Sequence, residues 1–141
     1  MNEAVDLALV QVDLSGVAGK RVAVVVQAGS SAETAWPAHL TAQLQSNIAA
    51  AGGTVSQDQP DIQVVANVSR ATVQKRIRYV SFMPFFFADL IECQSYWAEF
   101  ACVFEFKDAS GAQVLNPQAI PTVMTMPRKS TQWFTWGQVM Y

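Results

Sequence analysis

Few of the side chains that carry out acid–base, nucleophilic or metal chemistry occur in this chain. The single histidine, His39, lies near the start of a helical pattern and away from its apolar stripe, as a solvated surface residue does. The two cysteines, Cys93 and Cys102, have no CxxC spacing and cannot build a zinc site with one histidine. Nothing pairs Glu92 or Glu99 as acid and base. The sequence therefore predicts no catalytic residue, no metal site and no cofactor, and a protein that is not an enzyme.

Two further classes of ligand are disfavoured. The glycines at 16, 19 and 29 match neither a phosphate-binding loop nor a dinucleotide-binding fingerprint. The formal net charge of −2 and the isoelectric point near 5.2 argue against nucleic acid as a partner, because nucleic-acid-binding domains are normally basic.

The strongest feature is an aromatic stretch over residues 79–97, with a basic run directly before it. Half of the eight phenylalanines lie in a span of six residues within it, at 82–87. Its apolar members are Phe82, Met83, Phe85, Phe86 and Phe87. The basic run is Lys75, Arg76 and Arg78. Such a stretch is core, a surface covered by a partner, or a surface resting on lipid, and the sequence leaves all three open.

The composition adds to this picture. The chain is 51% hydrophobic and only 14% charged, against roughly 25% in a typical soluble domain, so we expect part of its surface to be covered. No apolar run reaches the roughly 20 residues of a spanning helix. The N-terminus has early acids and no Lys or Arg, so we expect either a cytoplasmic protein or an exported domain whose leader has been replaced by Met1.

Local patterns predict the elements in order. Loose alternation predicts an edge strand at 7–14, and a β-branched run predicts a strand at 21–27 covered on both faces. Trp36, Leu40, Leu44 and Ile48 recur every four residues and predict a helix, with Gly52 at its C-terminal end. A strand follows at 61–71. If it continues through 72–78, where the pattern inverts, a bulge near 69–71 would restore one consistent apolar face.

The second half continues with a connection at 79–91. Residues 95–107 alternate cleanly and predict a long strand, and residues 112–115 return as a hairpin. If that strand is continuous, Cys93 and Cys102 lie about 30 Å apart on opposite faces and stay free thiols. Prolines predict an irregular segment at 116–127. The tail could form a final strand anchored by Trp133 and Trp136.

The predicted fold class is therefore α+β, with one amphipathic helix packed on a mostly antiparallel sheet in a two-layer sandwich. Residues 1–141 form a single domain, with an aromatic insert at 79–91 and an aromatic C-terminal tail at 128–141.

The strand–helix–strand unit GKRVAVVVQ, PAHLTAQLQSNIAAAGGTV and PDIQVVANV resembles the core of several bacterial envelope lipoproteins. It is similar to the LPS-assembly lipoprotein, the conjugative surface-exclusion lipoprotein, and the curli-secretion and TolB N-terminal type of domain. The matching positions include Gly53, Val55 and Asp61, within roughly residues 19–115. The chain departs from this group in having no N-terminal lipobox cysteine and in carrying the insert at 82–87. The resemblance implies a non-enzymatic part of an envelope assembly, tethered to the outer membrane, and it carries over no functional residue.

These observations predict a structural or assembly component of a bacterial cell-envelope complex, such as a secretion or surface machine, at the periplasmic face of the outer membrane. Its partners would be other protein subunits, with a homo-oligomer and membrane or lipid contact left open. The alternative is a binding module for an amphiphile or an acylated glycan such as LPS. The predicted contact residues are Phe82, Met83, Phe85, Phe86, Phe87, Trp133, Trp136, Lys75, Arg76 and Arg78.

Overall fold

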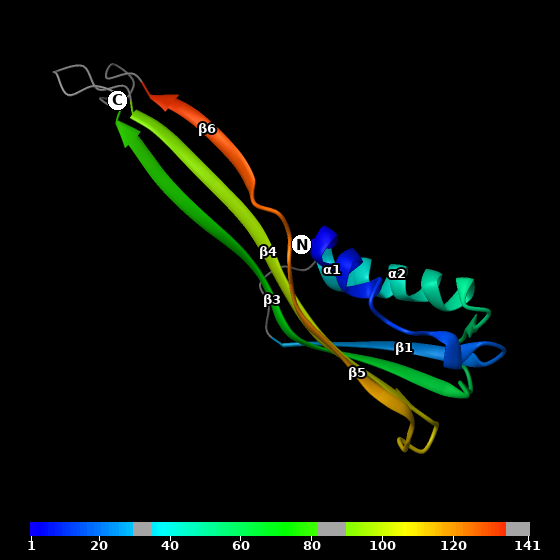
Figure 1. Cartoon of the computed structure of the whole chain (residues 1–141). Helices are drawn as coiled ribbons and strands as arrows, with labels where there is room; N and C mark the ends of the chain where they lie inside the picture. The colour runs from blue at the N-terminus through cyan, green and yellow to red at the C-terminus, as the bar shows by residue number, and fades with distance from the viewer. Residues whose placement is uncertain (30–34, 82–89, 135–141) are drawn as a thin grey trace.

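The computed structural model describes residues 1–29, 35–81 and 90–134, which form two helices and a six-stranded mixed sheet (Figure 1). The strand order is β2-β1-β3-β4-β5, and β6 also pairs with β4. The elements are α1 (Asn2–Leu9), a short 3-10 turn (Ser15–Val17), β1 (Arg21–Ala28), α2 (Ala35–Ala50), β2 (Thr54–Val55), β3 (Ile62–Ser81), β4 (Leu90–Lys107), β5 (Gln113–Met124) and β6 (Arg128–Phe134).

The predicted sandwich of one helix on a mostly antiparallel sheet is wrong. The chain is mostly strand, β1 runs parallel to both β2 and β3, and two helices rather than one pack on the sheet. The N-terminal strand predicted at 7–14 is replaced by α1, which buries Ala4, Val5, Ala8 and Leu9. Those positions recur at helical spacing, so the loose alternation after residue 7 was the weaker of two overlapping patterns.

Helix α2 is confirmed, together with its buried face. Trp36, Leu40, Leu44 and Ile48 are each at most 1% exposed. The helix ends where Gly52 adopts a φ of +88° and the Gly53 amide donates to the Ile48 carbonyl oxygen at 2.9 Å. Only glycine takes such a φ without strain, so the sequence encodes this stop directly.

The hydrophobic core lies between the helices and one face of the sheet, which we call the helix-side face. Phe100, Phe104 and Phe106 of β4 are fully buried there, and the Phe100 ring meets Trp36 edge-on with centroids 5.8 Å apart. His39 of α2 was expected to be a solvated surface residue. It is partly buried, and its Nε2 lies 2.7 Å from the Asp6 carboxylate of α1, so it joins the two helices.

The predicted bulge in β3 is confirmed. Val68 pairs with Cys102 and Arg70 pairs with Ala101, so Ser69 is the extra residue. After it, Ala71 faces Phe100 and Val73 faces Ala98, which returns the apolar residues of β3 to the helix-side face.

The irregular segment predicted at 116–127 is wrong for most of its length. Residues up to Met124 belong to β5, which pairs only with β4 among the described strands. Pro117 and Pro121 are tolerated because this is an edge strand, where a missing N–H breaks no ladder on the outer side. At its end Thr125 exchanges two hydrogen bonds with the backbone of Ala98 (2.9 and 3.0 Å), and the chain then turns into β6 along the same edge of β4.

Strands β3, β4 and β6 continue beyond the helices as a three-stranded projection (Figure 1). We call this projection, residues 71–81, 90–97 and 128–134, the arm. The rest of the described chain, in which the helices cover the sheet, is the body.

Candidate interaction surface

The helix-side face of the sheet continues from the body onto the arm without its cover. Pairing places Val73, Ile77 and Tyr79 of β3 on this face, in line with the buried Ala98 and Phe100. Near Val73 the N-terminal end of α1 still lies against the sheet. Beyond it the side chains are open: Ile77 is 41% and Tyr79 64% exposed. An apolar row that is core in the body is therefore surface in the arm.

Polar contacts organise the same face between these apolar side chains. The Lys75 ammonium lies 5.4 Å from the centre of the Tyr96 ring, close enough for a cation–π contact. The Tyr96 hydroxyl donates to the Gln94 side chain, whose amide donates in turn to Glu92. This line of side chains along β4 holds the Tyr96 ring in a defined orientation.

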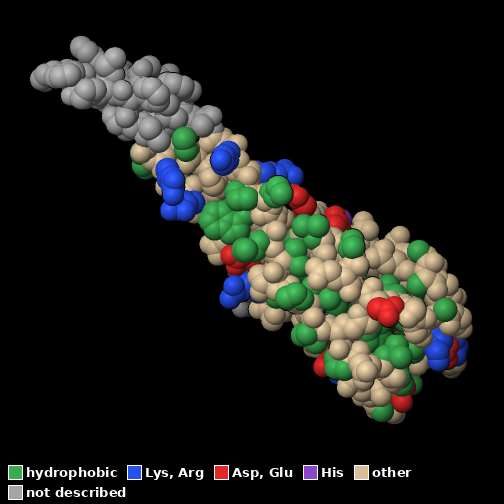
Figure 2. Space-filling view, in the orientation of Figure 1, with side chains coloured by type: hydrophobic (Ala, Val, Ile, Leu, Met, Phe, Trp, Pro, Cys, Tyr) green, Lys and Arg blue, Asp and Glu red, His purple; other side chains and the backbone are tan. Residues whose placement is uncertain are grey.

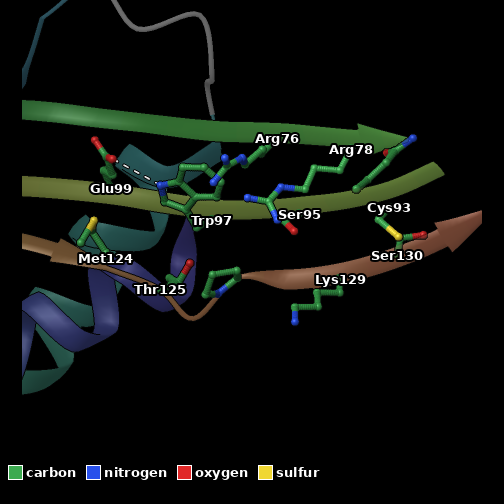
Figure 3. Close-up of a pocket in the computed structure, with 12 residues that line it drawn as sticks. Arg76, Arg78, Cys93, Ser95, Trp97, Glu99, Met124, Thr125, Lys129 and Ser130 are labelled. Carbon is green, nitrogen blue, oxygen red and sulfur yellow. Dashed lines mark hydrogen bonds between the residues drawn. The ribbon is translucent and has the colours of Figure 1, made fainter. Parts of the chain in front are cut away.

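The opposite face of the arm carries a groove of about 780 Å³ (Figure 3). Trp97 of β4 lies between Arg76 of β3 and Met124 at the end of β5. Arg78 and Lys129 line the groove further along the arm. Its apolar floor and cationic rim suit a ligand or a partner segment that is apolar in one part and anionic in another.

Trp97 is held in place by a carboxylate that also binds a cation. Its indole Nε1 donates to Glu99 Oε1 at 3.3 Å, and Glu99 Oε2 accepts from Arg70 at 3.3 Å. Glu99 is thereby neutralised by Arg70, whereas Arg76 and Arg78 form no ion pair with any described residue. The rim keeps these two positive charges available.

Charge is unevenly divided between the arm and the body. Among described residues, the arm holds five of the nine Lys and Arg but one carboxylate, Glu92. The five cations are Lys75, Arg76, Arg78, Arg128 and Lys129. Figure 2 shows Lys and Arg side chains next to hydrophobic ones along the arm. Most described Asp and Glu residues lie in the body, so the arm is a basic projection on an acidic protein.

The residues of the predicted basic run lie on two different faces of the arm. Arg76 and Arg78 line the groove, while Lys75 lies on the helix-side face over Tyr96. Trp133 belongs to β6, and its backbone pairs with that of Ile91 in β4. The other predicted contact residues lie outside the described residues, and the prediction for them stays a prediction: Phe82, Met83, Phe85, Phe86, Phe87 and Trp136.

Sequence reasoning did not single out several residues of this surface. Trp97 gave a usable signal, since it is a large aromatic residue on the side of the 95–107 strand that carries Glu99, Glu105 and Lys107. Val73 and Ile77 gave another, because they fall on the inverted part of the β3 pattern. Met124 gave none, because its place beside Trp97 depends on the pairing of β5 with β4.

The described residues gather no group of side chains that could hold a metal ion. No cluster of three His, Cys, Asp or Glu side chains occurs among them. Both cysteines are free, as predicted, with Cys93 partly exposed on the groove and Cys102 buried in the core. Burial raises the pKa of the Cys102 thiol to about 12, so this sulfur stays protonated and unreactive.

Asp61, one of the positions that carried the resemblance, has a structural role. Its carboxylate accepts from the backbone N–H of Arg21 at 2.9 Å and from the Arg21 guanidinium at 3.0 Å. These hydrogen bonds lower the pKa of Asp61 and join the starts of β1 and β3. The residue belongs to the body and lies outside the candidate surface.

Comparison with known proteins yields no family. No family model and no curated protein matches the chain. Solved structures do match, among them a minor lipoprotein from Acinetobacter baumannii, which is 15% identical with a TM-score of 0.38. The match covers 86% of this chain and 69% of that one. A likeness at this level is too low to transfer a function. Within the described residues, no helix has both the length and the apolarity needed to cross a membrane.

Proposed function

We propose that this protein is a non-enzymatic assembly component whose arm docks on other protein subunits. The observation that carries the proposal is the uncovered apolar row of the arm, in which Val73, Ile77 and Tyr79 extend the face that forms the core of the body. A row of exposed apolar side chains on a projecting sheet is typical of a surface that a partner covers. The low charge content of the chain is consistent with such a cover.

The setting that we propose is a bacterial cell-envelope complex, such as a secretion or surface machine, at the periplasmic face of the outer membrane. The support is the resemblance of residues 19–115 to envelope lipoproteins with a strand–helix–strand core. In that setting the body holds the arm at a fixed angle, and the arm makes the contacts.

Site-specific photo-crosslinking in the native cell tests the proposal. A photo-crosslinking amino acid in place of Ile77 should give one or a few protein adducts of discrete mass. The same amino acid in place of Val114 is the matched control, because Val114 is similarly exposed (44% against 41%) but belongs to the body.

The two positions separate the possible outcomes. Discrete protein adducts at position 77 that are absent at position 114 support docking through the arm. Equal adducts at both positions, or adducts with lipid alone at position 77, contradict it.

A second candidate function rests on the groove. Its apolar floor at Trp97 and Met124 and its cations at Arg76, Arg78 and Lys129 favour an anionic amphiphile, such as an acylated glycan of the LPS type. In a thermal-shift titration, dodecyl phosphate should stabilise the protein more than dodecyltrimethylammonium or inorganic phosphate does. The variant Trp97→Ala should lose this difference, and an unchanged difference would exclude the groove as the site.

A further inference from the structure

Among the described strands, none pairs along the arm with the edge of β3 that faces away from β4. Strand β1 pairs with β3 only from Ile62 to Val68, and no other described strand pairs with that side. Residues 71–79 therefore present about 30 Å of unpaired backbone N–H and C=O groups on one edge. This stretch contains no proline, and the only bulge of β3, at Ser69, lies before it.

The charges along this edge disfavour pairing between two copies of the chain. An antiparallel pair of two β3 edges would bring Lys75, Arg76 and Arg78 of one copy against the same cations of the other. Like charges on neighbouring strands are destabilising, and lysines or arginines on an edge are a known protection against self-pairing. The same cations attract a strand that carries carboxylates.

The two faces of the edge require different side chains from an added strand. Arg76 and Arg78 lie on the groove face, so residues of the new strand next to them would be acidic. Val73, Ile77 and Tyr79 lie on the helix-side face, where the one cation, Lys75, already contacts the Tyr96 ring, so the intervening residues of the new strand would be apolar. Alternating acidic and apolar residues satisfy both faces at once.

We propose that the β3 edge at residues 71–79 binds an extended segment of a partner protein, with alternating acidic and apolar residues, as an additional strand of the arm. This inference rests on the proposed function and names the chemistry of the partner segment. Main-chain hydrogen bonds supply affinity in this mode of recognition, and alternate side chains supply specificity.

The test uses the whole protein and a fluorescein-labelled nonapeptide, blocked at both ends, that alternates Val and Glu. Fluorescence anisotropy should show saturable binding, which weakens as salt is added. A peptide of the same composition with five Val followed by four Glu should bind at least about tenfold more weakly, because only the alternating one satisfies both faces.

Two further changes identify the edge itself. N-methylation of all Glu or of all Val blocks the backbone N–H groups on one side of the peptide, so one set should abolish binding and the other should not. In the protein, Arg78→Glu should weaken binding about fivefold, and Lys20→Glu, the same change in the exposed turn before β1, should not.

The results are decisive in each direction. Strand addition is overturned if the alternating peptide and the peptide of five Val followed by four Glu bind equally. It is also overturned if neither N-methylated set affects binding, or if the protein binds phosphatidylglycerol vesicles but not the peptide. If discrete crosslinks at position 77 persist in that case, docking through the arm stands and only its mode is rejected. If the peptide binds as expected but position 77 gives no discrete crosslinks in the cell, the proposed function is rejected instead.

Discussion

Cys93 and Cys102 show how one strand places the same residue type in two different environments. Both lie on β4, nine positions apart, so alternation places them on opposite faces of the strand. Cys102 is 1% exposed, and burial raises the pKa of its thiol to about 12 from a normal value of 9.0. Folding therefore favours the protonated thiol at this position.

This shift predicts an alkaline loss of stability. Between pH 9 and pH 12 the unfolded chain loses the Cys102 proton and the folded chain keeps it, so the free energy of unfolding falls as pH rises. Urea unfolding at pH 9 and pH 10.5 should show the advantage of the wild type over Cys102→Ala shrinking by about 2 kcal/mol. A constant difference for Cys102→Ala would contradict this assignment.

At the scale of the element, the bulge at Ser69 determines which face of the arm is apolar. Before it, Val64 and Val68 lie on the helix-side face, and after it Ala71 and Val73 do. Since side chains alternate with a period of two, the single extra residue changes the orientation of everything after it. The bulge thus separates the cations of the groove from the apolar row.

Deletion of Ser69 is the corresponding prediction. The deletion removes only the extra residue, so plain alternation still pairs Arg70 with Ala101 and keeps Ala71 and Val73 opposite Phe100 and Ala98. We expect the free energy of unfolding to fall by only about 1 kcal/mol, chiefly through loss of the Ser69 hydrogen bond.

The control for the deletion is Ser69→Ala. It keeps the residue count and removes only the hydrogen bond from the Ser69 hydroxyl to the Ala101 carbonyl oxygen, so it should cost about 1 kcal/mol. If the deletion cost at least about 3 kcal/mol more than this substitution, Ser69 would not be the extra residue that sets the faces of β3.

At the scale of the whole molecule, the protein is a body with an arm. The helices cover the sheet in the body and reach only the base of the arm, near Val73, and the arm extends past them (Figures 1 and 2). A compact chain of this length has a radius of gyration of roughly 14 Å. Small-angle X-ray scattering, extrapolated to zero concentration, should give a clearly larger value and a distance distribution with an extended tail. A value near 14 Å would mean that the arm folds back on the body.

Several features could be predicted from the sequence because short-range patterns encode them. The stripe at Trp36, Leu40, Leu44 and Ile48 requires a helix, and the glycine at 52 ends it. The change of pattern after Val68 requires a bulge. In each case the information lies within one or two turns or within a few residues of a strand.

The wrong predictions of secondary structure concern segments in which contacts with distant strands and helices outweigh the local sequence pattern. The stretch with Pro117 and Pro121 lacks a strand signal, yet β4 offers an edge on which it can pair. Residues 7–14 alternate loosely, but burial of Ala4, Val5 and Ala8 against the sheet and α2 favours a helix. Both outcomes depend on neighbours that are distant in the sequence.

The sequence by itself determined the composition of the arm: cations followed by aromatic residues, and an alternating strand to pair with them. Only the tertiary structure decided that Lys75 and Arg76 lie on different faces, that Trp97 and Met124 line one groove, and that one edge of β3 pairs with no described strand along the arm. The physical reason is that exposure depends on where other elements end. The helices and β1 stop before the arm, so the same alternation that makes a core in the body makes a binding surface beyond it.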